Sequence, residues 1–501
     1  MRKVYLSAVA LIAGFTFFTF SGTALASYTT TQLTNGGQKP HINSGGQVVW
    51  RFWDGTDYEI FLFTPGSGNV QLTDNIYDDG SPNNTDADPQ INDSGQVVWR
   101  GWDGTDYEIY LFTPGSGTVQ LTDNIYNDGG SIPEDGDSGP QINSSGQVVW
   151  KGSDGTDDEI YLYTSSTGTV QLTDNNYRDY SPQINAAGQV VWSDNDGADW
   201  EIYLYTPGSG TIQLTDNGYY DNFPQINSSG QVVWTGSDGA DYENYLYTPG
   251  FGTVQLTDNN YQDFFPQINS SGQVVWAAEP GIGMGTIMLY TPGSGIVQLN
   301  DNGFHGYGPR INAGGQVIWG GWDIAEAVAG TLQGIGLYIY TPGTGTDTLA
   351  EDHDNFYQAQ INASGQVVWM GAGGILLASP CTGTKPSLRL LAPGGSPGSM
   401  RSYYDSYADY LARKLILVGA VSNEGPDTAY DVKITSGTHF TNGVSSYTPL
   451  PLSLGDIPPS SVTPLAEGKF YVLLPISGVG IFLGNFRGEG KDLCGTTYTY
   501  P

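Results

Sequence analysis

Short apolar runs separated by turn-forming residues recur along the chain as far as about residue 379. The copy at residues 89–124 reads PQINDSGQVVWRGWDGTDYEIYLFTPGSGTVQLTDN. It predicts four β-strands, at Pro89–Asn92, Gln96–Trp99, Glu108–Thr113 and Thr118–Thr122. Compact Asn, Ser, Gly and Pro turns follow the first and third strands. The second and third strands are apolar nearly throughout, which is typical of strands covered on both faces.

A tryptophan ends the second strand of every copy, and consecutive copies lie 42 to 51 residues apart. A period near 42 with four short strands per copy is typical of a β-propeller blade. The repeated tryptophans are then expected to pack between neighbouring blades. They are Trp50, Trp99, Trp150, Trp192, Trp234, Trp276, Trp319 and Trp369.

The order of strand types predicts how the ring closes. The chain begins with a lone fourth-type strand, Thr30–Thr34, and its last copy, which ends at Ile375–Ala378, lacks one. We therefore expect the N-terminal strand to complete the eighth blade, which removes the exposed sheet edges. The predicted fold is all-β, an eight-bladed propeller over residues 27–379. Seven blades plus an irregular module is the alternative, because copies six to eight diverge.

The repeat P-x-I-N-x-x-G-Q-V-V-W, followed by E-I-Y-L-Y-T-P-G-x-G-x-V-Q-L-T, resembles the TolB-type, WD-repeat-like propeller repeat over about residues 28–379. Residues 143–147, NSSGQ, occupy the place of the S-P-D-G-K turn of that family. The resemblance implies a propeller. It implies no single activity, since such repeats occur in scaffolds, binding proteins and peptidase gates.

The first 26 residues predict a cleavable secretory signal. Arg2 and Lys3 precede an apolar stretch, Val4–Phe20, and Ala24-Leu25-Ala26 supplies small residues for cleavage. A retained membrane anchor is the weaker alternative, because the apolar stretch is short. We expect a soluble protein with no transmembrane segment after signal removal. It would be secreted, periplasmic or at the cell surface.

Blade-like text stops at residue 380, and short strands separated by turns follow. Residues 421–435, VSNEGPDTAYDVKIT, resemble a motif of Ig-like modules in bacterial surface proteins, including the CARDB type. Residues 380–501 are therefore expected to form a small Ig-like β-sandwich with a short linker. Cys381 and Cys494 bracket it, and export favours a disulfide between them; two separate thiols are the alternative.

The chain is strongly acidic, with 51 Asp and Glu against 17 Lys and Arg and a net charge of −34. Such a surface repels phosphate backbones and excludes nucleic acid as a partner. A protein or glycan partner, or a cation, fits better. No cofactor is required by the sequence, but calcium is a candidate.

Carboxylates gather in the loop between the second and third strands of the first five copies. Three interpretations compete: turn formation and solvation, a Ca²⁺ site of three carboxylates per loop, or a surface for glycans or basic partners. The candidate metal ligands are Asp54, Asp57, Glu59, Asp103, Asp106, Glu108, Asp154, Asp157, Glu159, Asp196, Asp199, Glu201, Asp238, Asp241 and Glu243. The candidate ligand-binding aromatic residues on the same face are Trp53, Trp102, Tyr77, Tyr126, Tyr177, Tyr219 and Tyr261.

No catalytic residue is assigned, because a catalytic centre needs unlike groups that converge once, whereas these acids repeat. The expected function is an exported, non-catalytic binding or scaffold protein that presents an acidic propeller face. One alternative is a glycan-active hydrolase or lyase with its site in the divergent loops of blades six to eight. The other is a purely structural envelope or matrix component.

Overall fold

The computed structural model describes residues 28–55, 57–74, 87–129, 139–279, 285–300, 304–324, 335–352, 356, 358–371 and 373–380, and beyond them the backbone of nine strands. Every named element is a β-strand. Blades one to four are β2–β5 (Gln38–Ile42, Val48–Trp53, Tyr58–Thr64, Gly68–Gln71), β6–β9 (Ala87–Ile91, Val97–Trp102, Tyr107–Thr113, Gly117–Gln120), β10–β13 (Gln141–Ile142, Val148–Ser153, Asp158–Thr164, Gly168–Gln171) and β14–β17 (Asp179–Ile184, Val190–Asn195, Trp200–Thr206, Gly210–Gln213).

Blades five to eight continue the order. They are β18–β21 (Asp221–Ile226, Val232–Ser237, Tyr242–Thr248, Gly252–Gln255), β22–β25 (Gln262–Ile268, Val274–Glu279, Thr286–Thr291, Gly295–Gln298), β26–β29 (Phe304–Ile311, Val317–Asp323, Ile335–Thr341, Gly345–Asp352) and β30–β32 (Gln360–Ile361, Val367–Gly371, Gly374–Pro380) with β1 (Tyr28–Gln32).

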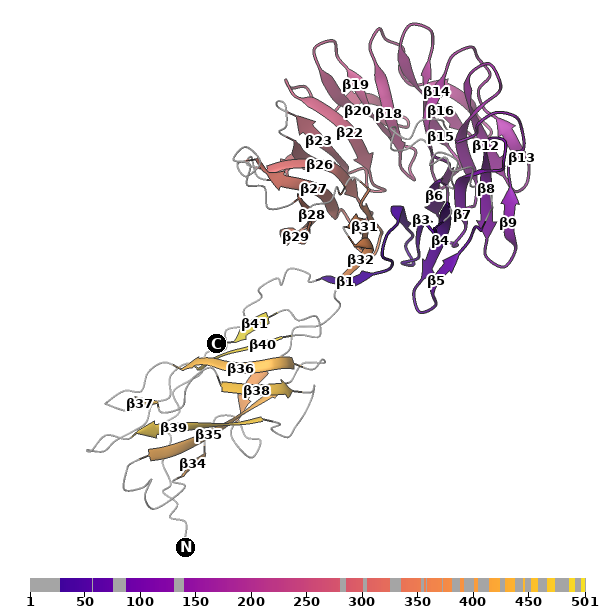
Figure 1. Ribbon diagram of the computed structural model, residues 1–501. Coiled ribbons are helices and arrows are strands. Elements are labelled where there is room, and N and C mark those ends of the chain that lie inside the picture. Colours follow the sequence, from indigo (N-terminus) through magenta and orange to yellow (C-terminus); the bar gives the residue numbers. More distant parts are fainter. Residues whose placement is uncertain are drawn as a thin grey trace. The chain divides into compact units, whose positions relative to one another are not determined.

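Each blade is a sheet of four strands paired in chain order, except the eighth, whose order is β1-β32-β31-β30. The first strand of the chain is therefore the fourth strand of the last blade, and Leu33 N donates to Ile375 O beyond it. Figure 1 shows the blades arranged in a ring, with first strands such as β6 toward the centre and fourth strands such as β9 outside. The predicted eight blades and their closure by the N-terminal strand are confirmed.

The repeated tryptophans form the core between the blades, as predicted. All eight are at most 2% exposed. Trp99 of the second blade, for example, packs with Val49, Ile60 and Leu62 of the first. Trp50 packs with Ile375 and other apolar residues of the eighth blade, so the same contact closes the ring. Burial of these large side chains contributes much of the hydrophobic stabilisation of the propeller.

A closed ring of eight asparagines joins the turns after the first strands. The side-chain Nδ2 of each donates to the backbone oxygen of the equivalent asparagine in the next blade, at 2.9–3.1 Å. Asn362 donates to Asn43 and closes the circle. The ring is Asn43, Asn92, Asn143, Asn185, Asn227, Asn269, Asn312 and Asn362, and each is buried.

The Gly-Gln pair of the same turn also links blades. A Cβ on Gly188 would lie 2.8 Å from Oε1 of Gln147 in the preceding blade, and Gly188 has a φ of +77°. Glycine is therefore required twice, by the left-handed backbone and by the neighbouring glutamine. Gln189 in turn donates to the Thr206 hydroxyl at the end of the third strand of its own blade.

A β-bulge interrupts the first strand of most blades at the residue before the proline. Lys39, Asp88, Ser181, Phe223 and Phe265 have φ values between 51° and 57°, and Gly308 has 58°. A non-glycine residue in this region is strained, and residues before proline ordinarily adopt an extended conformation. The bulge explains why the first strands begin earlier than the predicted Pro89–Asn92 and its counterparts: the pairing shifts but resumes beyond it.

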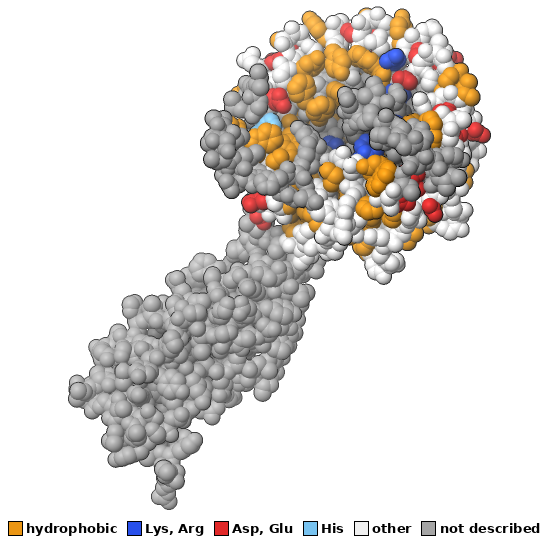
Figure 2. All heavy atoms as spheres, viewed as in Figure 1, with side chains coloured by type: hydrophobic (Ala, Val, Ile, Leu, Met, Phe, Trp, Pro, Cys, Tyr) orange, Lys and Arg blue, Asp and Glu red, His pale blue; other side chains and the backbone are white. Residues whose placement is uncertain are grey.

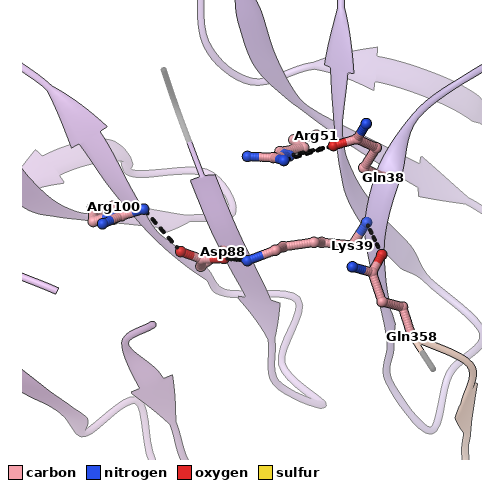
Figure 3. A network of polar contacts seen from close by, with 6 residues as sticks. All are labelled: Gln38, Lys39, Arg51, Asp88, Arg100 and Gln358. Carbon is pink, nitrogen blue, oxygen red and sulfur yellow. Dashed lines mark hydrogen bonds and ion pairs between the residues drawn. The ribbon is translucent and has the colours of Figure 1, made fainter. Parts of the chain in front are cut away.

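The bulge residues of neighbouring blades contact one another around the centre of the ring. Lys39 pairs with Asp88, which also accepts from Arg100 at 3.2 Å, and the backbone N of Lys39 donates to Gln358 of the eighth blade (Figure 3). Lys39 and Arg100 hold the pKa of the Asp88 carboxyl below its usual value despite its burial. On another side of the ring the Phe223 and Phe265 rings lie 4.9 Å apart.

The C-terminal unit, described by itself, contains two antiparallel sheets. One contains β33 (Leu388–Leu391), β34 (Arg401–Tyr403), β35 (Lys414–Asn423), β37 (Ser445–Ser446) and β39 (Ala466–Leu473); the other contains β36 (Ala429–Gly437), β38 (Leu452–Ile457), β40 (Phe486–Lys491) and β41 (Thr497–Tyr500). An Ig-like sandwich remains a prediction. The signal sequence, Cys381 and Cys494 lie outside the described residues. Among the residues that are described, no helix is long and apolar enough to cross a membrane.

Candidate functional site

The predicted acidic loops connect the second and third strands of blades one to five. In the second blade the hairpin pairs Gly101 with Glu108 and closes with Asp103 N donating to Asp106 O. Asp103 Oδ1 accepts from the backbone N of Thr105 and Asp106. The first aspartate of the loop therefore forms the turn, as the first of the three interpretations predicts. Figure 2 shows a face on which Asp and Glu side chains are distributed around the ring, whereas most of the visible Lys and Arg side chains lie nearer its centre.

In blades two to five the glutamate of the acidic loop also positions the loop that leads to the next blade. Glu108 Oε1 accepts from Asn124 N at 2.9 Å, and the same bond recurs from Asn217 to Glu201 and from Asn259 to Glu243 at 2.8 Å. A threonine hydroxyl beside it accepts from the third strand, as Thr122 does from Ile109 N. The glutamate of E-I and the threonine of L-T in the repeat therefore act together: their hydrogen bonds fix one corner, where the third strand begins and the fourth strand ends.

The fold gathers the acids of these loops into five clusters, here called the carboxylate triads. In each, one oxygen per carboxylate lies within 4.8 Å of the others. Blades three to five use the aspartates and glutamate that the sequence singled out. Blades one and two instead recruit the aspartate that follows the fourth strand, which the sequence analysis did not include. The triads are Asp54/Glu59/Asp74, Asp103/Glu108/Asp123, Asp154/Asp157/Glu159, Asp196/Asp199/Glu201 and Asp238/Asp241/Glu243.

One oxygen of four triad glutamates is buried without a hydrogen bond. Glu108, Glu159, Glu201 and Glu243 are 0% exposed, and Oε2 of each has no hydrogen-bond partner. Burial is the main reason that the pKa of Glu108 is raised to about 7, with the charges of Asp128 and Asp106 adding to it. Burial likewise raises the pKa of Glu201 and of Glu243 to about 7. The threonine of the same corner lowers the pKa of each of these glutamates, but not enough to offset the burial.

A tyrosine from the preceding interblade loop covers each of three acidic loops. Tyr126 lies where a Cβ on Gly155 would be, and Tyr177 and Tyr219 bear the same relation to Gly197 and Gly239. The glycine of the D-G turn is therefore needed for this packing as well as for its positive φ. The three rings remain 38–49% exposed, and Tyr261 is 46% exposed. Tyr77 lies outside the described residues.

Trp53 lines an open pocket of about 430 Å³ between the first and eighth blades. Phe52 and Tyr58 form its aromatic wall, with the Trp53 and Tyr58 rings 5.4 Å apart and edge to face. Asn35 and Gln38 contribute polar groups, and glycines of the last blade form the opposite wall. Trp53 is 45% exposed, whereas Trp102, the equivalent residue in the second blade, is half-buried against Tyr107.

The divergent blades replace the triads by neutral contacts. In the sixth blade Asn300 takes the place of the threonine, and its Oδ1 accepts from Ile287 N at 2.7 Å while Nδ2 donates to Phe304 O. His305 of the seventh blade accepts from Gly285 N at 2.6 Å and packs 4.0 Å from the Trp322 ring. Burial lowers the pKa of His305, so this histidine is a neutral packing residue at neutral pH.

No protein-family model and no curated protein sequence matches the chain. Among solved structures, similarity is found to the Porphyromonas gingivalis dipeptidyl peptidase 4 (10% identity, 79% of this chain and 58% of that one, TM-score 0.49). It is also found to the β-propeller domain of the Trilobed protease from Pyrococcus furiosus (12%, 64% and 99%, 0.42) and to virginiamycin B lyase from Staphylococcus aureus (12%, 60% and 96%, 0.39). At this level of similarity no activity transfers. The eight-bladed fold rests on the strand pairing itself, and the TolB-type assignment remains a resemblance.

Proposed function

We propose that the protein is an exported, non-catalytic scaffold whose acidic propeller face binds a glycan at the cell surface. The pocket at the junction of the first and eighth blades carries this proposal. It combines the exposed Trp53 ring with Phe52, Tyr58 and two amide side chains. Aromatic faces stack on sugar rings, and a few fixed amides orient hydroxyl groups.

The surroundings of this pocket favour a neutral glycan over an anionic one. The triad Asp54/Glu59/Asp74 belongs to the same blade, and the chain carries a net charge of −34. Carboxylates accept hydrogen bonds from sugar hydroxyls but repel sulfate and uronate groups. The exposed tyrosines on successive blades would add weak contacts to a long polymer, so that repetition raises the overall affinity.

The test is affinity electrophoresis and calorimetry of the protein with neutral and anionic polysaccharides. We expect binding to a neutral polymer that falls at least tenfold in Trp53→Ala and less in Trp53→Phe, because phenylalanine keeps an aromatic face. Phe251→Ala is the control, since Phe251 is 91% exposed in a turn between third and fourth strands, away from the acidic loops. If the Trp53 variants bound the polymer as tightly as the wild type, or if the protein released shorter sugars from the polymer, the proposal would be contradicted.

A further inference from the structure

We propose that each of the four carboxylate triads of blades two to five binds one calcium ion and that these ions stiffen the acidic face of the propeller. The inference deepens the proposed function, and rests on it only in treating this face as the binding face. The four glutamates with a buried, unpartnered oxygen carry the argument: Glu108, Glu159, Glu201 and Glu243.

The spacing of the oxygens suits a shared ion. Calcium binds oxygen at about 2.3–2.6 Å, so two oxygens on the same ion lie at most about 5 Å apart. The three carboxylates of each triad meet this limit. The loop is also fixed in advance, because Asp154 accepts from Thr156 N at 2.7 Å while Glu159 Oε1 accepts from Asn175 N. Oε2 of Glu159 has no hydrogen-bond partner.

The unmet oxygens extend from the glutamates to the aspartates of the loops. Asp157 has neither carboxylate oxygen hydrogen-bonded, and one buried oxygen each of Asp106, Asp199 and Asp241 also lacks a partner. Like-charged oxygens held together away from water are costly unless a cation lies between them. Three carboxylates around one divalent ion reverse that cost, because the ion is then the largest local charge.

The sixth blade shows that closing the corner does not require a carboxylate. Asn300 holds the start of the third strand and the following loop with neutral hydrogen bonds. If the glutamates of blades two to five served only to close this corner, an uncharged residue would suffice there too. Their second oxygens therefore point to a ligand that the sixth blade lacks.

Calcium fits these triads better than magnesium. Calcium accepts six to eight oxygens in an adaptable geometry, so water and loop carbonyls complete the shell around three carboxylates. Magnesium requires a near-ideal octahedron at shorter distances and retains most of its water. The tyrosines that cover the third to fifth loops contact the loop glycines, so we expect them to sensitise terbium, a luminescent substitute for calcium.

The experiment uses the protein without its predicted signal sequence, freed of metals by a chelator. Calorimetry then measures how many calcium ions it binds. We expect about four equivalents, one per triad of blades two to five, and a saturable rise in melting temperature. Glu159→Gln should lose one equivalent. The combined replacement of Glu108, Glu159, Glu201 and Glu243 by Gln should abolish uptake and the terbium signal. Asp93→Asn is the control, because Asp93 is exposed in a turn between first and second strands.

Melting in chelator separates loss of the site from loss of the fold. Glutamine keeps the acceptor for Asn175 N and removes a buried charge, so Glu159→Gln without metal should melt no lower than the wild type. Absence of calcium uptake by the wild type, four equivalents in Glu159→Gln, or tighter binding of magnesium would overturn the inference. Calcium uptake without polysaccharide binding would overturn the proposed function alone. Polysaccharide binding without calcium uptake would overturn this inference alone.

Discussion

Replacing one member of the asparagine ring tests whether the ring holds the blades together. Asn227 makes four side-chain hydrogen bonds: Nδ2 donates to Asn269 O at 3.0 Å and to Gln231 Oε1 at 2.9 Å, and Oδ1 accepts from Ser229 N and Gln231 N, each at 3.0 Å. A hydrogen bond contributes about 1 kcal/mol net. Because the turn amide of exposed Ser229 can bind water instead, Asn227→Ala should lower the unfolding free energy by about 3 kcal/mol.

Asn227→Asp distinguishes the loss of donors from the loss of the side chain. The carboxylate keeps one acceptor for the two backbone amides. Its second oxygen then faces Asn269 O and Gln231 Oε1, which are both acceptors. At pH 7 we expect a loss at least as large as that of Asn227→Ala. At pH 4 the protonated acid can donate again, so Asn227→Asp should become the more stable of the two variants.

Urea unfolding followed by tryptophan fluorescence is the assay, because the eight repeated tryptophans are buried and report the propeller directly. Ser228→Ala is the matched control: Ser228 is exposed in the same turn, and the fourth blade has Ala186 at the equivalent position. A loss below about 1 kcal/mol in Asn227→Ala, or equal stabilities of the two variants at both pH values, would refute a stabilising ring.

Three further predictions concern strain and buried charge. Ser181→Gly should raise the unfolding free energy by about 0.5–1 kcal/mol in urea titrations, because Ser181 has a φ of 53° and the seventh blade has Gly308 there; a loss would show that the bulge is unstrained. Asp194→Gly should raise the melting temperature at pH 8, since the carboxylate of Asp194 faces that of Asp179 across β14 and β15 where neighbouring blades have glycine; an unchanged value would contradict this. Burial raises the pKa of Asp221 to about 6, despite hydrogen bonds from Asn217 and Trp234. A carboxyl group whose pKa is raised by folding stabilises the fold only at low pH, and this stabilisation is lost as the pH rises through the raised pKa. In chelator, the unfolding free energy of the wild type should therefore fall by up to about 3 kcal/mol relative to that of Asp221→Asn as the pH rises from 4 to 7. Parallel pH dependences of the two melting temperatures would contradict this.

Much of the fold could be predicted because its signals are local. A strand covered on both faces reads as a continuous apolar run, and turn residues mark its ends, so the number of blades follows from counting. The lone strand at Thr30–Thr34 predicted closure for the same reason, and β1 pairs with β32. The bulge before the proline could not be predicted, since residues as different as Lys39 and Phe223 adopt it. It is set by contacts around the ring, which no local pattern records.

The asparagine ring and the triads show where sequence reasoning stopped. Asparagine occurs in all eight turns, and that constancy was a usable signal, but turn formation explained it without any contact between blades. Asp74 and Asp123, which follow the fourth strands, lie with the loop acids in the triads of blades one and two. Only the three-dimensional path of the chain after the fourth strand brings those aspartates to the others.

The two ends of the strands in each repeat differ in their polar side chains and in how these are hydrogen-bonded. At one end, neutral asparagine side chains link blade to blade, and glutamine side chains of the same turns bond within their own blade. At the other end, equally repetitive acids leave buried oxygens without partners in blades two to five. A fold that satisfies one end completely has no structural reason to leave the other end incomplete. The unsatisfied end is therefore where a cation or ligand is expected, and calcium uptake should stiffen that end while leaving the asparagine ring unchanged.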